Sequence, residues 1–195
     1  MQSLREIYKT GKGPSSSHTM GPERAIKIIR GLYPEADALK VTLYGSLALT
    51  GKGHNTDTVI IQTASPLPCE VVWNETAPCD VHPNTMDIEV LKGGGKIAEK
   101  RVYSVGGGTV YFDGEPAERY EKYADDGIYP LNSYTEISKY CKSHNLRIWQ
   151  YVEKYEGKEI FDYLGRVWEN MKRSIHQGLP SSGTLPAIHG TKRRA

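Results

Sequence analysis

The stretch GKGPSSSHTMGPER, residues 11–24, is the part of the chain that decides the fold. It places three consecutive serines and a histidine directly before a predicted helix. Thr19 or Gly21 can cap this helix. Pro22 suits the first helical position, and Glu23 follows where the helix dipole favours an acid. Apolar residues then recur at helical spacing and predict a helix face packed in a core: Ala25, Ile26, Ile28, Ile29, Leu32 and Tyr33.

The serines of this stretch indicate an anion site. Backbone N–H groups and hydroxyls at a helix N-terminus suit a carboxylate or a phosphate. The alternative is a solvated loop in which the last of the serines caps the helix. A P-loop is excluded, because Lys12 precedes the serines and the GxxxxGKS/T order is absent.

The composition indicates a globular protein with room for one ordinary domain and part of another. The 195 residues are 38% hydrophobic and 25% charged, and 25 basic against 23 acidic side chains give a net charge of +2. This balance gives no reason to expect nucleic-acid binding, and no apolar run approaches the roughly 18 residues that cross a membrane. Because the N-terminal residues also lack the apolar core of a signal peptide, we expect a cytoplasmic protein.

The periodicity changes along the chain from alternating to helical. Alternation and turn residues predict strands over 39–45, 70–73, 86–91, 97–105 and 109–113. Helical spacing predicts helices over 134–143, 146–156 and 158–177. We therefore expect an α+β fold, with a mixed or antiparallel sheet and packed helices over residues 1–130. An incomplete all-helical segment over residues 131–195 should follow it.

A second group of polar residues follows Gly51-Lys52-Gly53. His54 lies on this flexible backbone, with Asp57 three residues further on. A neutral imidazole is the natural proton acceptor near pH 7, and a carboxylate can orient it. The alternative is a polar loop in which Asp57 caps the next segment.

Two later stretches add candidate binding groups. His82-Pro83-Asn84-Thr85 offers an imidazole, an amide and a hydroxyl in a turn-prone segment. Gly106-Gly107-Gly108 allows a backbone to approach a ligand closely. The alternatives are a turn stabilised by Asn84 and an ordinary hairpin link.

Together these motifs resemble the bacterial iron–sulfur L-serine dehydratases. The resemblance is carried, in order, by residues 13–25, 51–57, 82–86, 103–108 and 192–195. It implies a substrate-binding β-like domain over 1–130 and the start of a helical α-like domain over 131–195, which the chain does not complete. It also implies a helix capped by Thr56 or Asp57, although the β-branched residues 58–63 favour a strand by propensity. We predict the helix. Asn55 stands where this family often has glycine.

The resemblance implies the elimination of water from L-serine, which yields pyruvate and ammonia. It makes His54 the base, with Asp57 as its possible orienting group. The substrate would be bound by Ser15, Ser16, Ser17, His18, Thr19, Asn84, Thr85 and Gly107. The basic end, Lys192-Arg193-Arg194, would run close to the active site.

The resemblance further implies a [4Fe–4S] cluster whose ligands lie outside this chain. Cys69, Cys79 and Cys141 do not match the family's ligands, they suggest no disulfide framework, and we expect no metal held by this chain alone. The expected partners are L-serine and a cluster-bearing α domain or subunit within an oligomer. The expected processes are serine catabolism and gluconeogenesis.

Two other functions are considered. The first domain also resembles a regulatory domain of some phosphoglycerate dehydrogenases, so a non-catalytic module that binds serine or another small carboxylate is the alternative. A hydrolase that uses Ser17 and His54 is weakly supported, because no GxSxG elbow is present.

Overall fold

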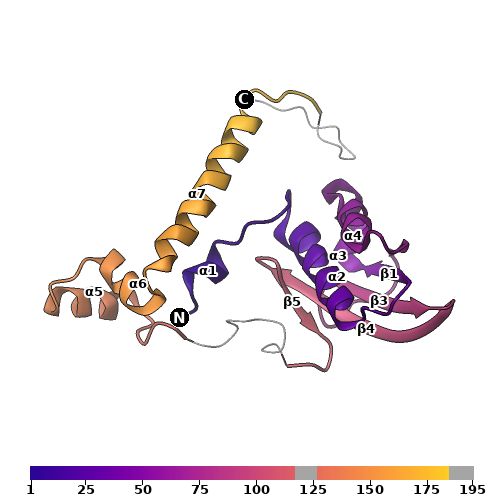
Figure 1. The fold of residues 1–195 in the computed structure, drawn as a ribbon, viewed down its shortest axis with the longest axis horizontal. Coiled ribbons are helices and arrows are strands. Elements are labelled where there is room, and N and C mark those ends of the chain that lie inside the picture. The colour runs from indigo at the N-terminus through magenta and orange to yellow at the C-terminus, as the bar shows by residue number, and fades with distance from the viewer. Residues whose placement is uncertain (117–126, 185–195) are drawn as a thin grey trace. The chain divides into compact units, whose positions relative to one another are not determined.

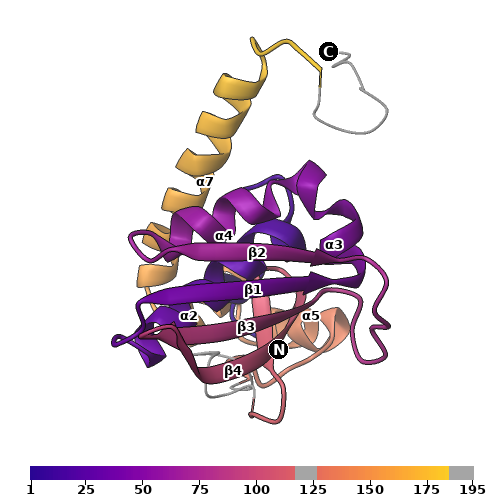
Figure 2. The same ribbon diagram turned by 90° about the vertical axis from the view of Figure 1, so that its right-hand side faces the viewer.

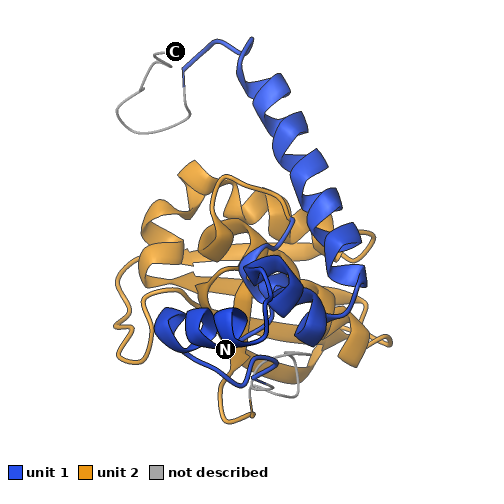
Figure 3. Cartoon of the chain, turned by 90° about the vertical axis from the view of Figure 1, so that its left-hand side faces the viewer, with its two compact units in different colours: residues 1–10, 122–185, 192–195 blue, residues 11–121, 186–191 orange. Residues whose placement is uncertain are grey.

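The chain folds into two compact units, coloured separately in Figure 3. The computed structural model describes residues 1–116 and 127–184. Among these, residues 11–116 form an α+β unit, and residues 1–10 together with 127–184 form a helical unit. The predicted α+β class is confirmed.

One mixed sheet organises the α+β unit. Its strands are β1 (Ala38–Tyr44), β2 (Cys69–Asn74), β3 (Thr85–Lys92), β4 (Gly95–Gly106) and β5 (Thr109–Phe112). Their order is β2-β1-β3-β4-β5, and Figure 2 shows the first four of these side by side. β1 and β2 run parallel, and the helices between them provide the crossover connection that parallel strands require. Every other neighbouring pair is antiparallel.

The helices of this unit bury one face of the sheet. They are α2 (Gly21–Leu32), α3 (Gly45–Thr50) and α4 (Thr56–Ala64), which Figure 1 labels. The π-helical turn η1 (Ser16–Met20) precedes α2, and the 3₁₀ turn η2 (Gly51–His54) lies between α3 and α4. Alternate residues of the strands and the apolar side of α2 meet in one core, which includes Ile26, Ile29, Leu39, Val41, Leu43, Met86, Ile88, Val90, Val102 and Val110. Each large side chain buried there contributes about 1.5–3 kcal/mol to folding.

The predicted helix over residues 58–63 is confirmed as part of α4. Val59 and Ile60 are buried against α2 and β2, so packing overrides their preference for strands. The expected caps are wrong: Asn55 occupies the N-cap position, with φ 56°. This left-handed backbone favours glycine and tolerates asparagine, so Asn55 fits a position at which the resemblance leads us to expect glycine.

The helical unit gathers the N-terminal residues with the later helices. Its elements are α1 (Leu4–Ile7), α5 (Tyr134–Ser143), α6 (Ile148–Glu156) and α7 (Glu159–Gly178). The carboxylate of Glu156 accepts hydrogen bonds from the Ser3 hydroxyl (2.7 Å), the Leu4 N–H (2.6 Å) and the Tyr129 hydroxyl (2.9 Å). Residues 1–10 therefore fold with the helices and not with the sheet. Within the described ranges, no helix is long and apolar enough to cross a membrane.

Candidate functional site

The serine-rich stretch forms the π-helical turn η1 and runs directly into α2. Ser15 is the N-cap of η1, and its hydroxyl accepts a hydrogen bond from the His18 N–H at 3.2 Å. The predicted caps of this helix, Thr19 or Gly21, and the alternative cap, Ser17, are therefore wrong. Single π turns inside helices occur often at functional sites, because the wider turn redirects the backbone groups.

His18 is buried and holds the turn against α3. Its Nε2 lies 3.2 Å from the Ser46 carbonyl oxygen and 3.0 Å from the Thr50 hydroxyl. A carbonyl oxygen only accepts, so Nε2 carries the proton. Nδ1 then accepts from the Ser17 hydroxyl at 3.0 Å. His18 is thus a neutral imidazole with both nitrogens engaged.

His54 lies against His18, with the ring centroids 4.7 Å apart. Its Nδ1 is 2.9 Å from the Thr50 carbonyl oxygen. Because that oxygen only accepts, Nδ1 carries a proton and donates it to the Thr50 carbonyl. The Thr19 hydroxyl also donates to the His54 carbonyl at 3.2 Å, so the backbone of His54 is tied to η1.

The carboxylate of Asp57 is placed differently from the expectation. It accepts from the Thr58 N–H at 2.8 Å, in the first turn of α4, where an acid favours the helix dipole. The Thr50 carbonyl therefore occupies the position beside His54 that was predicted for Asp57. The role of Asp57 stays a prediction.

The second half of the site comes from the sheet. The Ser104 hydroxyl donates to the Ser17 carbonyl at 2.7 Å, and the Gly107 N–H donates to the Ser16 hydroxyl at 3.2 Å. The Asn84 amide donates to the Ser104 carbonyl at 3.2 Å, which orients that amide because a carbonyl oxygen only accepts. The amide oxygen of Asn84 is buried without a partner among the described residues. These contacts bring the predicted glycine and asparagine stretches to the serine turn.

Two predicted residues, Thr19 and Thr85, have mainly structural contacts. Thr19 is buried, and its hydroxyl is used by His54. Thr85 is buried, and its hydroxyl donates to the His82 carbonyl at 2.6 Å. The basic segment Lys192-Arg193-Arg194 lies outside the described residues.

Sequence reasoning missed Ser46, Thr50, Thr56 and Ser104, which hold the site together. Ser46 and Thr50 are four residues apart on one helix face, but this spacing is too common to identify a site. Thr56 is buried and donates to the His18 carbonyl at 2.7 Å. No sequence motif marks such a contact between distant segments.

The buried environment lowers the pKa of His18 below its ordinary value of 6.5. Burial is the largest cause, electrostatic repulsion from the neighbouring His54 ring adds to it, and the hydrogen bond to the Ser46 carbonyl opposes it. His18 is therefore neutral at pH 7, in agreement with its hydrogen bonds.

A stability measurement against pH tests this assignment. Below pH 6.5 the unfolded chain binds a proton at position 18 that the folded protein resists, so the free energy of unfolding should fall from pH 7 down to the lowered pKa. His18→Gln should lack this component and show a shallower decline over the same window. Parallel curves for His18→Gln and the parent would contradict the assignment.

The described cysteines do not fit an iron–sulfur cluster. Cys69 lies on β2, Cys79 lies in the loop after it, and Cys141 belongs to the other unit. Burial, with a smaller effect of Glu70, raises the pKa of the Cys69 thiol to about 11, whereas a cluster ligand is a thiolate. Across residues 1–116 and 127–184, no three His, Cys, Asp or Glu side chains group as metal ligands would.

The chain is similar to known L-serine dehydratases. Residues 3–66 match the family model described as serine dehydratase beta chain. L-serine dehydratase 2 of Escherichia coli (strain K12) is 31% identical over 241 residues, covering 100% of this chain and 53% of that protein. L-serine dehydratase 1 of the same strain is 29% identical over 251 residues with the same coverage. A Bacillus subtilis (strain 168) protein named "Probable L-serine dehydratase, beta chain" is 34% identical over 116 residues, covering 50% of this chain and 52% of that protein.

The α+β unit is a small domain whose sheet edge and serine-bearing helical turn form one polar site. Its sequence matches extend through this site, and the chain spans about half the length of the relatives that it matches. The chain carries a serine dehydratase beta-chain domain.

Proposed function

We propose that this chain acts in the elimination of water from L-serine, which yields aminoacrylate and then pyruvate and ammonia. Two findings support the proposal: the relatives are named L-serine dehydratases, and the site combines hydroxyls, N–H groups and an imidazole. The reaction needs a base for the α-proton and groups that hold the substrate's carboxylate.

The observation that carries the proposal is the hydrogen bond between His54 Nδ1 and the Thr50 carbonyl at 2.9 Å. In the neutral imidazole, this bond makes Nε2 the nitrogen that can take a proton, and a backbone acceptor holds the ring in place. The ring also contacts His18, which is bonded to the serine turn. We assign the removal of the α-proton to His54 Nε2.

The hydroxyl of Ser16 is the best placed to bind the carboxylate. It accepts from the Gly107 N–H, so its own hydrogen remains available to donate. By contrast, the Thr19 hydroxyl donates to His54, and that of Ser17 to His18 Nδ1. The unpartnered oxygen of Asn84 is a suitable acceptor for the substrate ammonium group.

Other parts of the proposal concern groups outside the described residues. The [4Fe–4S] cluster expected from the resemblance would polarise the leaving hydroxyl, and its thiolate ligands would come from elsewhere. An α domain or subunit is the expected source. The chain's own contribution is to bind serine, orient it and take the α-proton.

The test is anaerobic release of pyruvate from L-serine by this chain combined with the remaining half of an L-serine dehydratase. Pyruvate formation that requires this chain would support the proposal. If the chain binds serine but the assembled enzyme forms no pyruvate, the proposal is overturned in favour of a regulatory module.

Ser16→Ala should weaken serine binding by about tenfold or more, because a hydrogen bond to a charged group contributes about 1.5–3 kcal/mol. The loss should appear mainly in KM for L-serine, since the variant leaves His54 in place. Ser65→Ala, on an exposed turn after α4, is the matched control and should keep the parental KM. An unchanged KM for Ser16→Ala would remove Ser16 from the binding site.

A further inference from the structure

One side of α7 carries a row of exposed apolar side chains. The row follows the three- and four-residue spacing of a helix face that packs against another helix. We name it the α7 stripe; its members are Phe161, Leu164, Trp168, Met171, Ile175 and the C-cap Leu179.

The α7 stripe is not part of the helical unit's own core. Ile160 and Val167, on the adjacent side of α7, are buried. Five members of the stripe, by contrast, are between 41% and 67% exposed: Phe161, Trp168, Met171, Ile175 and Leu179. Trp149 of α6 extends the row, with its ring centroid 6.1 Å from that of Phe161. Single exposed apolar residues are ordinary, but a continuous row of this length marks an interaction surface.

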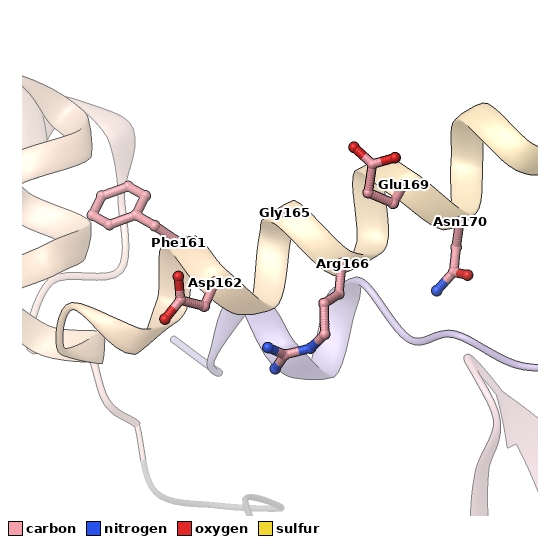
Figure 4. Close-up of a pocket in the computed structure, with 6 residues that line it drawn as sticks. All are labelled: Phe161, Asp162, Gly165, Arg166, Glu169 and Asn170. Carbon is pink, nitrogen blue, oxygen red and sulfur yellow. The ribbon is translucent and has the colours of Figure 1, made fainter.

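A hollow beside the stripe fits the approach of another helix. Phe161, Gly165 and Glu169 stand four residues apart on one ridge of α7, and Gly165 leaves a gap in that ridge (Figure 4). A Cβ atom at Gly165 would meet no heavy atom within 4 Å. Glycine inside a helix lowers its stability relative to alanine, so the gap has a cost that insertion of a partner's side chain would offset.

We infer that the α7 stripe docks a helical polypeptide with an apolar face. This partner corresponds to the half of the L-serine dehydratases that the chain does not span. The match covers 53% of each Escherichia coli relative, so about half of each lies outside it. The Bacillus subtilis relative is named as a separate beta chain. Among the described residues of the helical unit, the stripe is an extended apolar surface on which this remaining half can pack. The inference rests on the proposed function, because the partner is the rest of the same enzyme.

The binding test uses the part of Escherichia coli L-serine dehydratase 2 outside the match as the probe. Binding to the full chain is measured by light scattering and by titration. Trp168→Ser with Ile175→Ser should raise the Kd at least tenfold, and Gly165→Leu should raise it by filling the gap. Arg173→Ser, on the polar side of α7, is the matched control and should stay within twofold of the parent. The matched part of the Escherichia coli protein with its own remainder is the positive control.

Three results would overturn the inference. The first is a positive control that binds while this chain does not. The second is a dimer of this chain that the stripe substitutions convert to monomer, because the stripe then holds a second copy. The third is a monomer in which Trp168 is shielded from a soluble fluorescence quencher without the probe, because the chain then covers the stripe itself. The stripe variants leave Ser16 and His54 unchanged, so serine binding by the chain without the probe reports separately on the proposed function.

Discussion

Replacing His54 with glutamine should lower the turnover of L-serine by the assembled enzyme by about 100- to 10,000-fold, the usual contribution of a positioned general base. Glutamine retains a side-chain donor for the Thr50 carbonyl but has no group that takes a proton at neutral pH. The main loss should lie in kcat, with KM for L-serine close to the parental value, because the serine turn is unchanged.

Two comparisons make this result specific to the base. His144→Gln, at the exposed C-cap of α5, should leave turnover unchanged. Circular dichroism and serine binding should match the parent for both variants, because the backbone carbonyl of residue 54 still accepts from Thr19. Turnover of His54→Gln within a few-fold of the parent would exclude His54 as the base.

Gly21→Ala should destabilise the α+β unit by about 1–3 kcal/mol, the usual cost of overpacking a buried site. An added Cβ would lie 1.9 Å from the Ser104 hydroxyl oxygen, which is fully buried. Ser104 would have to move and lose its 2.7 Å bond to the Ser17 carbonyl, so serine binding should weaken together with stability. Denaturant unfolding, with hydrogen exchange of the β1 and β3 amides, measures the effect in this unit.

The same helix supplies the control for this prediction. Gly31 also lies in α2, but a Cβ there meets nothing within 4 Å. Gly31→Ala should therefore stabilise the protein by about 0.5–1 kcal/mol through helix propensity alone. Adding Ser104→Gly to Gly21→Ala should recover part of the lost stability, because it removes the colliding side chain. Equal stabilisation by alanine at positions 21 and 31 would show that Gly21 is not packed as described.

Local patterns were sufficient for most elements of the fold. The strands and the three later helices appear at their predicted positions, because alternating and helical periodicities report which face of each element is buried. The mixed order of the sheet and the parallel pairing of β1 with β2 were not derivable, since they depend on which segments meet after the chain crosses over. Residues 58–63 show the same limit: their propensity favours a strand, and packing against α2 and β2 makes them helical.

The candidate site could also be predicted only in part from the sequence. Residue types and motif order identified the serine turn, His54 and the asparagine and glycine stretches. The tautomer of His54 depends on a backbone carbonyl at Thr50, and sequence reasoning had assigned the orienting role to Asp57. Backbone acceptors leave no trace in residue identity, so only coordinates reveal them.

The amino-acid sequence by itself determined the elements, the α+β class and the chemical groups available to the site, because periodicity and side-chain chemistry are local properties. Tertiary structure alone decided that residues 1–10 join the helical unit through Glu156 and that Ser104 anchors the serine turn. These contacts link residues 153 and 87 positions apart. Hydrogen bonds over such separations exist only once the packed core has brought the segments together, and no short stretch of the chain encodes them.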